Sequence, residues 1–173
     1  MPKLVTLYND DAIKNQARQY VRSYILFPSG LLGLVSMLGA VGGLAYQVFG
    51  ASSYSATTFL ASSGLLILGG LCGWAQTRYH RYLFDTIPQV FAARIRSVVQ
   101  QSKKRHKIDP QETVIDHPGR VFVPLAYAAG LLALVGSSVW SVMQGAMEVV
   151  PAVLMPWAGF YWGKLFFWRG VVQ

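Results

Sequence analysis

Few side chains in this chain of 173 residues are suited to chemistry, and most of them stand between residues 80 and 117. His80 and Asp85 come first, and Asp116 and His117 follow about thirty residues later. Histidine and carboxylate groups together can bind a metal ion or transfer a proton. Their spacing matches no metal-ligand motif, however, and the run 116–119, which reads Asp-His-Pro-Gly, is typical of a turn. We therefore predict no catalytic residue and no metal site, and keep an enzyme with a site near His80, Asp85 and His117 as an alternative.

Cofactor chemistry finds equally little support in the sequence. The single cysteine, Cys72, stands inside an apolar block, where packing is its expected role. No histidine stands in the middle of an apolar block, so this chain alone cannot hold a haem between two histidines across a membrane. His80 near the end of a block could ligate a pigment, but an ordinary interfacial histidine is the simpler interpretation. We expect no cofactor, apart from a bound anionic phospholipid such as cardiolipin.

The elements that carry these residues are four long apolar blocks, at about 25–48, 56–75, 121–143 and 149–167. Hydrophobic residues make up 53% of the chain and charged residues 13%, which is too few charges to cover a soluble surface. Each block has roughly the 20 residues that a helix needs to cross the hydrocarbon core of a bilayer. We predict an all-α, polytopic membrane protein whose four transmembrane helices form two hairpins. Charged residues throughout 1–24 argue against a cleaved signal peptide there.

The connections between the blocks divide the chain into five segments. Short polar turns join the first block to the second and the third to the fourth, whereas a long basic linker joins the second to the third. Apolar residues at 87, 90, 91, 95, 98 and 99 predict an amphipathic helix in that linker, lying along the membrane surface. The predicted segments are an N-terminal arm 1–24, a hairpin 25–75, the linker 76–120, a hairpin 121–168 and a C-terminus 169–173.

The basic residues predict how the chain lies in its membrane. All 15 lysines and arginines belong to the N-terminal arm, the linker or the C-terminal end of the last block, and neither short turn contains one. By the positive-inside rule, the termini and the linker face the cytoplasm, or the matrix or stroma of an organelle. Aromatic residues such as Trp74, Tyr82 and Trp168 are expected at this inner interface. The mitochondrial inner membrane is our favoured location, with a bacterial plasma membrane or a thylakoid as alternatives.

The basic part of the linker has several possible roles. Anionic lipid headgroups are the leading candidate ligands, because each lysine or arginine near such a surface contributes about 1 kcal/mol of attraction. An acidic partner protein is the second interpretation and nucleic acid the third, and a solvated charge run that only orients the chain is the alternative without a ligand. We expect no nucleic acid, because the nearby aromatic residues belong to the membrane interface. The predicted lipid-binding residues are Arg94, Arg96, Lys103, Lys104, Arg105 and Lys107.

Glycines inside the blocks give the clearest packing signal. Two glycines four residues apart let the backbones of two helices approach closely, which is how helices associate in a membrane. The sequence leaves open whether the partner helices belong to this chain or to another subunit. The predicted packing pairs are Gly39 with Gly43, Gly69 with Gly73, and Gly159 with Gly163.

Buried charge, which transporters and pumps normally need, is almost missing from the blocks. Lys164 is the one charged residue within them. We therefore expect a non-catalytic accessory subunit of a larger respiratory or photosynthetic membrane complex, with other membrane subunits and anionic lipids as partners. The alternative is a small oligomeric channel or transporter, with a pore lined by hydroxyl groups of Ser36, Ser62, Ser63 or Ser137.

Overall fold

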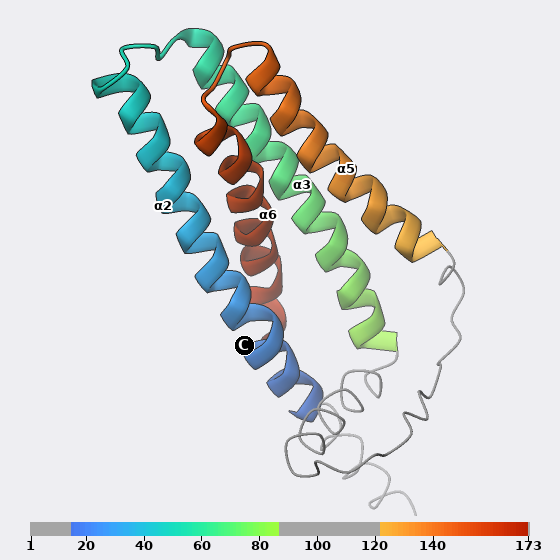
Figure 1. The fold of residues 1–173 in the computed structure, drawn as a ribbon. Helices are drawn as coiled ribbons and strands as arrows, with labels where there is room; N and C mark the ends of the chain where they lie inside the picture. Colours follow the sequence, from blue (N-terminus) through green and yellow to red (C-terminus); the bar gives the residue numbers. More distant parts are fainter. Residues whose placement is uncertain (1–14, 87–121, 173) are drawn as a thin grey trace, which may run out of the picture.

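The described part of the chain is a bundle of long helices with short connections (Figure 1). The computed structural model describes residues 15–86 and 122–172, and within these ranges every regular element is a helix, which confirms the predicted all-α class. The predicted amphipathic helix and the predicted lipid-binding residues lie outside these ranges. The elements are a π-helical turn η1 (Val21–Leu26), α2 (Phe27–Phe49), α3 (Ala56–Thr86), α5 (Phe122–Met143) and α6 (Val149–Val172).

Three of the helical segments are long and apolar enough to cross a membrane: Asn15–Phe49, Ala56–Asp85 and Phe122–Met143. The first begins about ten residues before the predicted block, and the second continues beyond its block, as expected. Large apolar side chains such as Leu38 and Leu132 cover their outer surfaces, where water would be an unfavourable solvent. These features indicate an integral membrane protein.

Pro28 explains the irregular turn η1. Pro28 stands in the first turn of α2 and has no N–H with which to bond the carbonyl of Tyr24. The turn before it, η1, is widened, and the N–H of Phe27 donates to the carbonyl oxygen of Arg22, five residues back. Wide turns of this kind let a helix pass a proline without breaking. The helix therefore runs from Asn15 to Phe49 without interruption.

Local hydrogen bonds and a glycine determine where helices begin and end at the two short connections. Ser55 caps α3: its N–H donates to Oγ1 of Thr58 at 3.3 Å, and the N–H of Thr58 donates to Oγ of Ser55 at 3.4 Å. This is a reciprocal capping arrangement. After α5, Gly145 adopts a φ of +64° and its N–H donates to the carbonyl of Val142 at 2.9 Å. A left-handed residue after the last turn ends the helix, and glycine is favoured there because it has no Cβ atom to oppose a positive φ.

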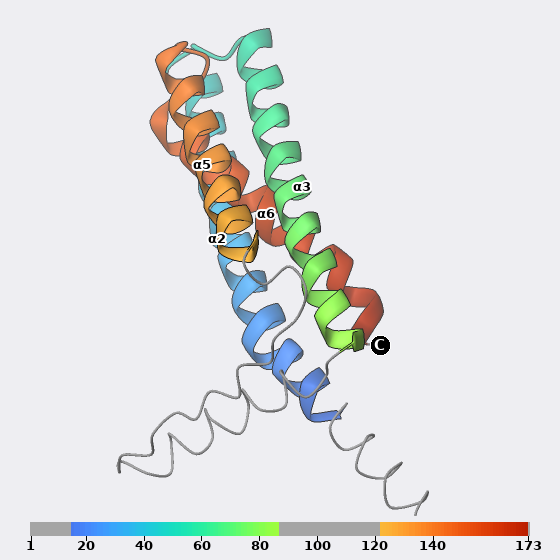
Figure 2. The same ribbon diagram turned by 90° about the vertical axis from the view of Figure 1, so that its right-hand side faces the viewer.

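Helix α6 is the centre of the bundle. It packs extensively against α3 and α2 and less extensively against α5, as two perpendicular views also show (Figures 1 and 2). The helices α2 and α3 follow one another in the sequence, but each packs mainly against α6 rather than against the other. The closest packing therefore joins elements far apart in the chain, and not the two halves of each predicted hairpin.

Glycines set the contact between α3 and α6. A Cβ atom added at Gly69 would collide with the carbonyl oxygen of Pro156, and one added at Gly159 would collide with the carbonyl oxygen of Leu66. At Gly163 it would lie 2.8 Å from the carbonyl oxygen of Gly70. The two backbones touch because these glycines have no side chain.

The contact between α2 and α6 is looser. A Cβ atom at Gly39 would meet the end of the Leu154 side chain at 2.5 Å, and one at Gly43 would meet Cδ of Pro151 at 2.8 Å. At both positions the nearest atom belongs to a side chain and not to a backbone carbonyl. All three predicted glycine pairs thus lie at contacts between helices of the same chain; their role in assembly with other subunits stays a prediction.

Helix α5 lies at the edge of the bundle. Its buried residues, Leu134, Ser138 and Ser141, all belong to its C-terminal half, while nearly all side chains from 122 to 133 are exposed. The hydroxyl of Tyr127 forms a hydrogen bond of 2.9 Å with Nε2 of His80 on α3. This bond links the exposed half of α5 to the bundle.

Replacing Tyr127 with phenylalanine should weaken that link. Hydrogen bonds between membrane helices contribute about 0.6 kcal/mol on average, so we expect a loss of unfolding free energy of that order. Steric-trap unfolding in bicelles would measure it. Tyr46→Phe is the matched control, because Tyr46 is exposed at the other end of the bundle. Equal losses of unfolding free energy in the two variants would contradict a stabilising hydrogen bond between Tyr127 and His80.

Candidate functional site

Charge is concentrated at one end of the bundle, which we call the positive end. There the first helix begins, and α3 and α6 end (Figure 1). The opposite end holds the two short connections, and Glu148 is the charged residue described there. The described basic residues all belong to the positive-end halves of their helices: Arg18, Arg22, Arg78, Arg81, Lys164 and Arg169.

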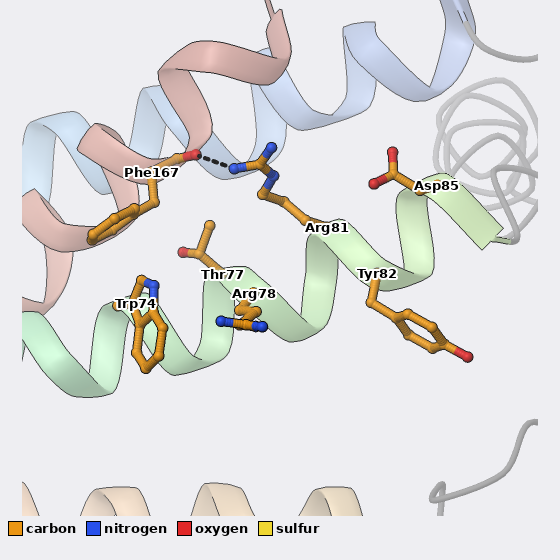
Figure 3. Close-up of a pocket in the computed structure, with 7 residues that line it drawn as sticks. All are labelled: Trp74, Thr77, Arg78, Arg81, Tyr82, Asp85 and Phe167. Carbon is orange, nitrogen blue, oxygen red and sulfur yellow. Dashed lines mark hydrogen bonds between the residues drawn. The ribbon is translucent and has the colours of Figure 1, made fainter.

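A cleft of about 310 Å³ lies at the positive end between α3 and α6 (Figure 3). Helix α3 provides most of its lining at positions three and four residues apart, which places these side chains on one face. Phe167 completes the lining from α6. The residues contributed by α3 are Trp74, Thr77, Arg78, Arg81, Tyr82 and Asp85.

Arg81 joins the two walls of the cleft. Its Nη1 donates to the carbonyl oxygen of Phe167 at 3.5 Å, drawn as a dashed line in Figure 3. Carbonyls near the C-terminal end of a helix attract cations, because the helix dipole is negative there. The contact therefore holds the guanidinium beside α6. A guanidinium has five N–H donors, and this bond uses one of them.

Arg78 is held on the other side of the cleft by Trp74. The central carbon of its guanidinium lies 5.5 Å from the centroid of the indole ring, which is a cation–π contact. The Trp74 ring in turn lies 6.5 Å from the ring of Phe167. Trp74 is 38% exposed and Tyr82 is 52% exposed, so an apolar surface with polar edges accompanies the two arginines.

Thr77 and Asp85 are the two remaining residues that line the cleft. Thr77 is fully buried, and its hydroxyl donates to the carbonyl of Gly73 at 2.7 Å, within its own helix. Asp85 stands one turn beyond Arg81, toward the end of α3. The lining thus carries two cations and one carboxylate, and such a surface attracts anions.

The sequence-predicted acid–base group does not converge in the described residues. His80 faces α5 through its bond to Tyr127, whereas Asp85 lines the cleft on the α6 side of the same helix. Asp116 and His117 lie outside the described residues. The geometry therefore gives no support to a joint role for His80 and Asp85.

Three of the four serines that were candidates for lining a pore are buried in the bundle or bonded to their own helix. Ser36 and Ser62 are buried, and the hydroxyl of Ser62 donates to the carbonyl of Phe59 at 3.0 Å. The hydroxyl of Ser137 donates to the carbonyl of Leu134 at 3.0 Å. Such bonds satisfy a hydroxyl group on its own helix, as is common for serine in membrane helices.

The structure also places Trp168 and Lys164, which the sequence put near the inner interface. Trp168 was expected at the interface but is fully buried, with its ring 6.2 Å from that of Phe84 in an edge-to-face contact. Lys164 is half-buried, and its ammonium lies 5.3 Å from the centroid of the Phe160 ring. Neither residue lines the cleft.

Sequence reasoning used Arg78 and Arg81 only to orient the chain and missed them as a site. Their signal was a spacing of three and four residues with Trp74, Tyr82 and Asp85. Comparison with protein-family models, curated proteins and solved structures gives no match for this chain. Its function is therefore inferred from its own residues and their geometry.

Proposed function

We propose that this protein is a non-catalytic accessory subunit of a larger energy-transducing membrane complex, respiratory or photosynthetic. The observation that carries the proposal is a row of small residues along α5, which no described part of the chain covers. We call it the α5 stripe, and its members are Ala126, Ala129, Gly130, Ala133 and Gly136.

The α5 stripe differs from the other glycine surfaces in having no partner helix among the described residues. A Cβ atom added at Gly130 or Gly136 would meet nothing within 4 Å, whereas one added at Gly69 or Gly159 would strike a backbone carbonyl. The buried face of α5, with Leu134 and Ser138, lies beside the stripe, because Leu134 follows Gly130 by four residues. Rows of small residues are typical of membrane surfaces against which another helix packs. A transmembrane helix of a partner subunit is the occupant that we propose.

We also propose that α6 is the fourth transmembrane helix. It is less apolar than the three spanning candidates, since it contains Lys164, Pro156 and several aromatic residues with polar edges. However, α3, α2 and α5 all pack against it, and its 24 residues give it a length of about 36 Å at 1.5 Å per residue. A helix surrounded by spanning helices is shielded from lipid and needs less apolar character of its own.

The proposed orientation follows from the distribution of charge. The positive end would face the cytoplasm, matrix or stroma, with the mitochondrial inner membrane as the favoured location. The basic linker would contact anionic lipid there. Replacing Lys103, Lys104, Arg105 and Lys107 together with glutamine should reduce the anionic lipid retained by the purified protein.

Native mass spectrometry of the protein, extracted gently from its own membrane, tests the accessory-subunit proposal. We expect it to travel in a large complex with redox or ATP-synthesising subunits. A protein that appears alone, or as a small homo-oligomer, would contradict the proposal. A homo-oligomer that also conducts ions in liposomes would favour the channel alternative.

A further inference from the structure

We propose that the cleft between α3 and α6 binds the phosphate of a phospholipid headgroup, with Arg78 and Arg81 as its ligands. This inference rests on one part of the proposed function, namely that the positive end lies in a headgroup layer. It does not require the accessory-subunit role. The site differs from the basic linker, because its cations are held in place by described contacts.

The depth of the cleft matches a lipid phosphate. The apolar block of α3 ends at Ala75, and 20 residues from Ala56 to Ala75 span about 30 Å, the thickness of the hydrocarbon core. Arg78 and Arg81 follow three and six residues later, roughly 5 and 9 Å beyond that boundary. Headgroups occupy this layer.

The side chains around the cleft fit the chemistry of a phosphodiester. Guanidinium groups bind phosphate oxygens through paired, charge-assisted hydrogen bonds. Arg78 and Arg81 approach from different sides because Trp74 holds the first and the Phe167 carbonyl holds the second. Both guanidinium groups are held in position before a ligand binds, which reduces the entropic cost of binding.

The aromatic walls favour a lipid over a free phosphate ion. Trp74 and Phe167 line the side of the cleft nearer the membrane, where glycerol and acyl carbons of a bound lipid would contact them. Tyr82 and Asp85 lie on the other side, toward the end of α3 (Figure 3). The carboxylate of Asp85 opposes excess negative charge, so a single phosphodiester suits the cleft better than a multiply charged phosphate.

The test measures binding of phosphatidylglycerol to the full-length protein in a neutral detergent by native mass spectrometry. All variants carry glutamines at 103, 104, 105 and 107, so that lipid binding to the basic linker does not hide lipid binding to the cleft. In that background we expect Arg78→Gln with Arg81→Gln to weaken the affinity at least about tenfold, as two charge-assisted contacts to phosphate are lost. Asp85→Asn should strengthen it, because a negative charge leaves the edge of the cleft.

Arg169→Gln is the matched control, because Arg169 is an exposed cation on α6 that does not line the cleft. It should change the affinity by less than about twofold, as expected for an exposed charge. Equal losses in the Arg169 variant and the double variant would overturn the proposal in favour of a general electrostatic field. An unchanged affinity in the double variant would also overturn it.

A competition experiment distinguishes the two sources of phosphate. Inorganic phosphate at 100-fold excess over the lipid should leave the lipid bound, because it cannot use the aromatic walls. Displacement at that excess would overturn the assignment to a lipid. All variants must show the thermal midpoint of the parent protein without added lipid, so that loss of binding is separated from loss of fold. If Arg81→Gln fails this criterion, Arg78→Gln alone carries the test, since Arg78 contacts Trp74 within its own helix.

Discussion

Replacing Gly159 with leucine is expected to abolish the native packing of α6 against α3. The reason is that the neighbour of Gly159 is a backbone group: an added Cβ would strike the carbonyl oxygen of Leu66 and lie 3.0 Å from the amide nitrogen of Gly70. A backbone oxygen inside a helix cannot move aside without breaking the helix, so the two helices must separate. Because α6 is the centre of the bundle, the whole fold should be affected.

Smaller substitutions make this prediction quantitative. Gly159→Ala should cost about 1–3 kcal/mol of unfolding free energy, the usual range for overpacking. Gly39→Ala should cost less, because its neighbour is the flexible end of Leu154. Gly42→Ala is the matched control, since nothing lies within 4 Å of its added Cβ. Steric-trap unfolding would rank the three variants, and equal losses at Gly159 and Gly42 would contradict backbone contact.

The second large effect is expected on assembly rather than on folding. Gly136→Leu, or Ala133→Leu, should release the protein from its complex while the isolated chain keeps its fold. A leucine in the α5 stripe holds a partner helix away, yet at Gly136 its Cβ atom meets nothing within 4 Å among the described residues. We expect the fraction of protein in the complex to fall at least about tenfold, measured by native gel electrophoresis of gently solubilised membranes.

Val135→Leu provides the comparison that this experiment needs. Val135 is exposed on the same helix, no member of the α5 stripe stands three or four residues from it, and the variant creates the same side chain. It should leave the complex intact. If both leucine variants in the stripe also leave it intact, the stripe faces lipid and the proposed docking surface is wrong.

Several features of this protein could be predicted because they depend on one segment at a time. The bounds of α5 and the start of α6 match the apolar blocks to within a residue, since the length of an apolar run directly determines whether a helix can cross a bilayer. The gathering of Arg18, Arg81 and Arg169 at one end also follows from the order of blocks and connections. The irregular turn before Pro28 was not predicted, although it too depends on a single residue, a proline without an N–H.

Pairing between helices could not be predicted in the same way. The glycine pairs at Gly69 and Gly159 indicate that some helix approaches closely, but a small-residue surface does not specify which one. Only the folded chain shows that these two surfaces meet each other and that the α5 stripe has no described partner. The cleft follows the same logic, because Arg81 comes from α3 and the carbonyl that orients it comes from Phe167 on α6. A periodicity describes one face of one helix, whereas a site needs two faces whose relative position depends on how closely the helix backbones approach.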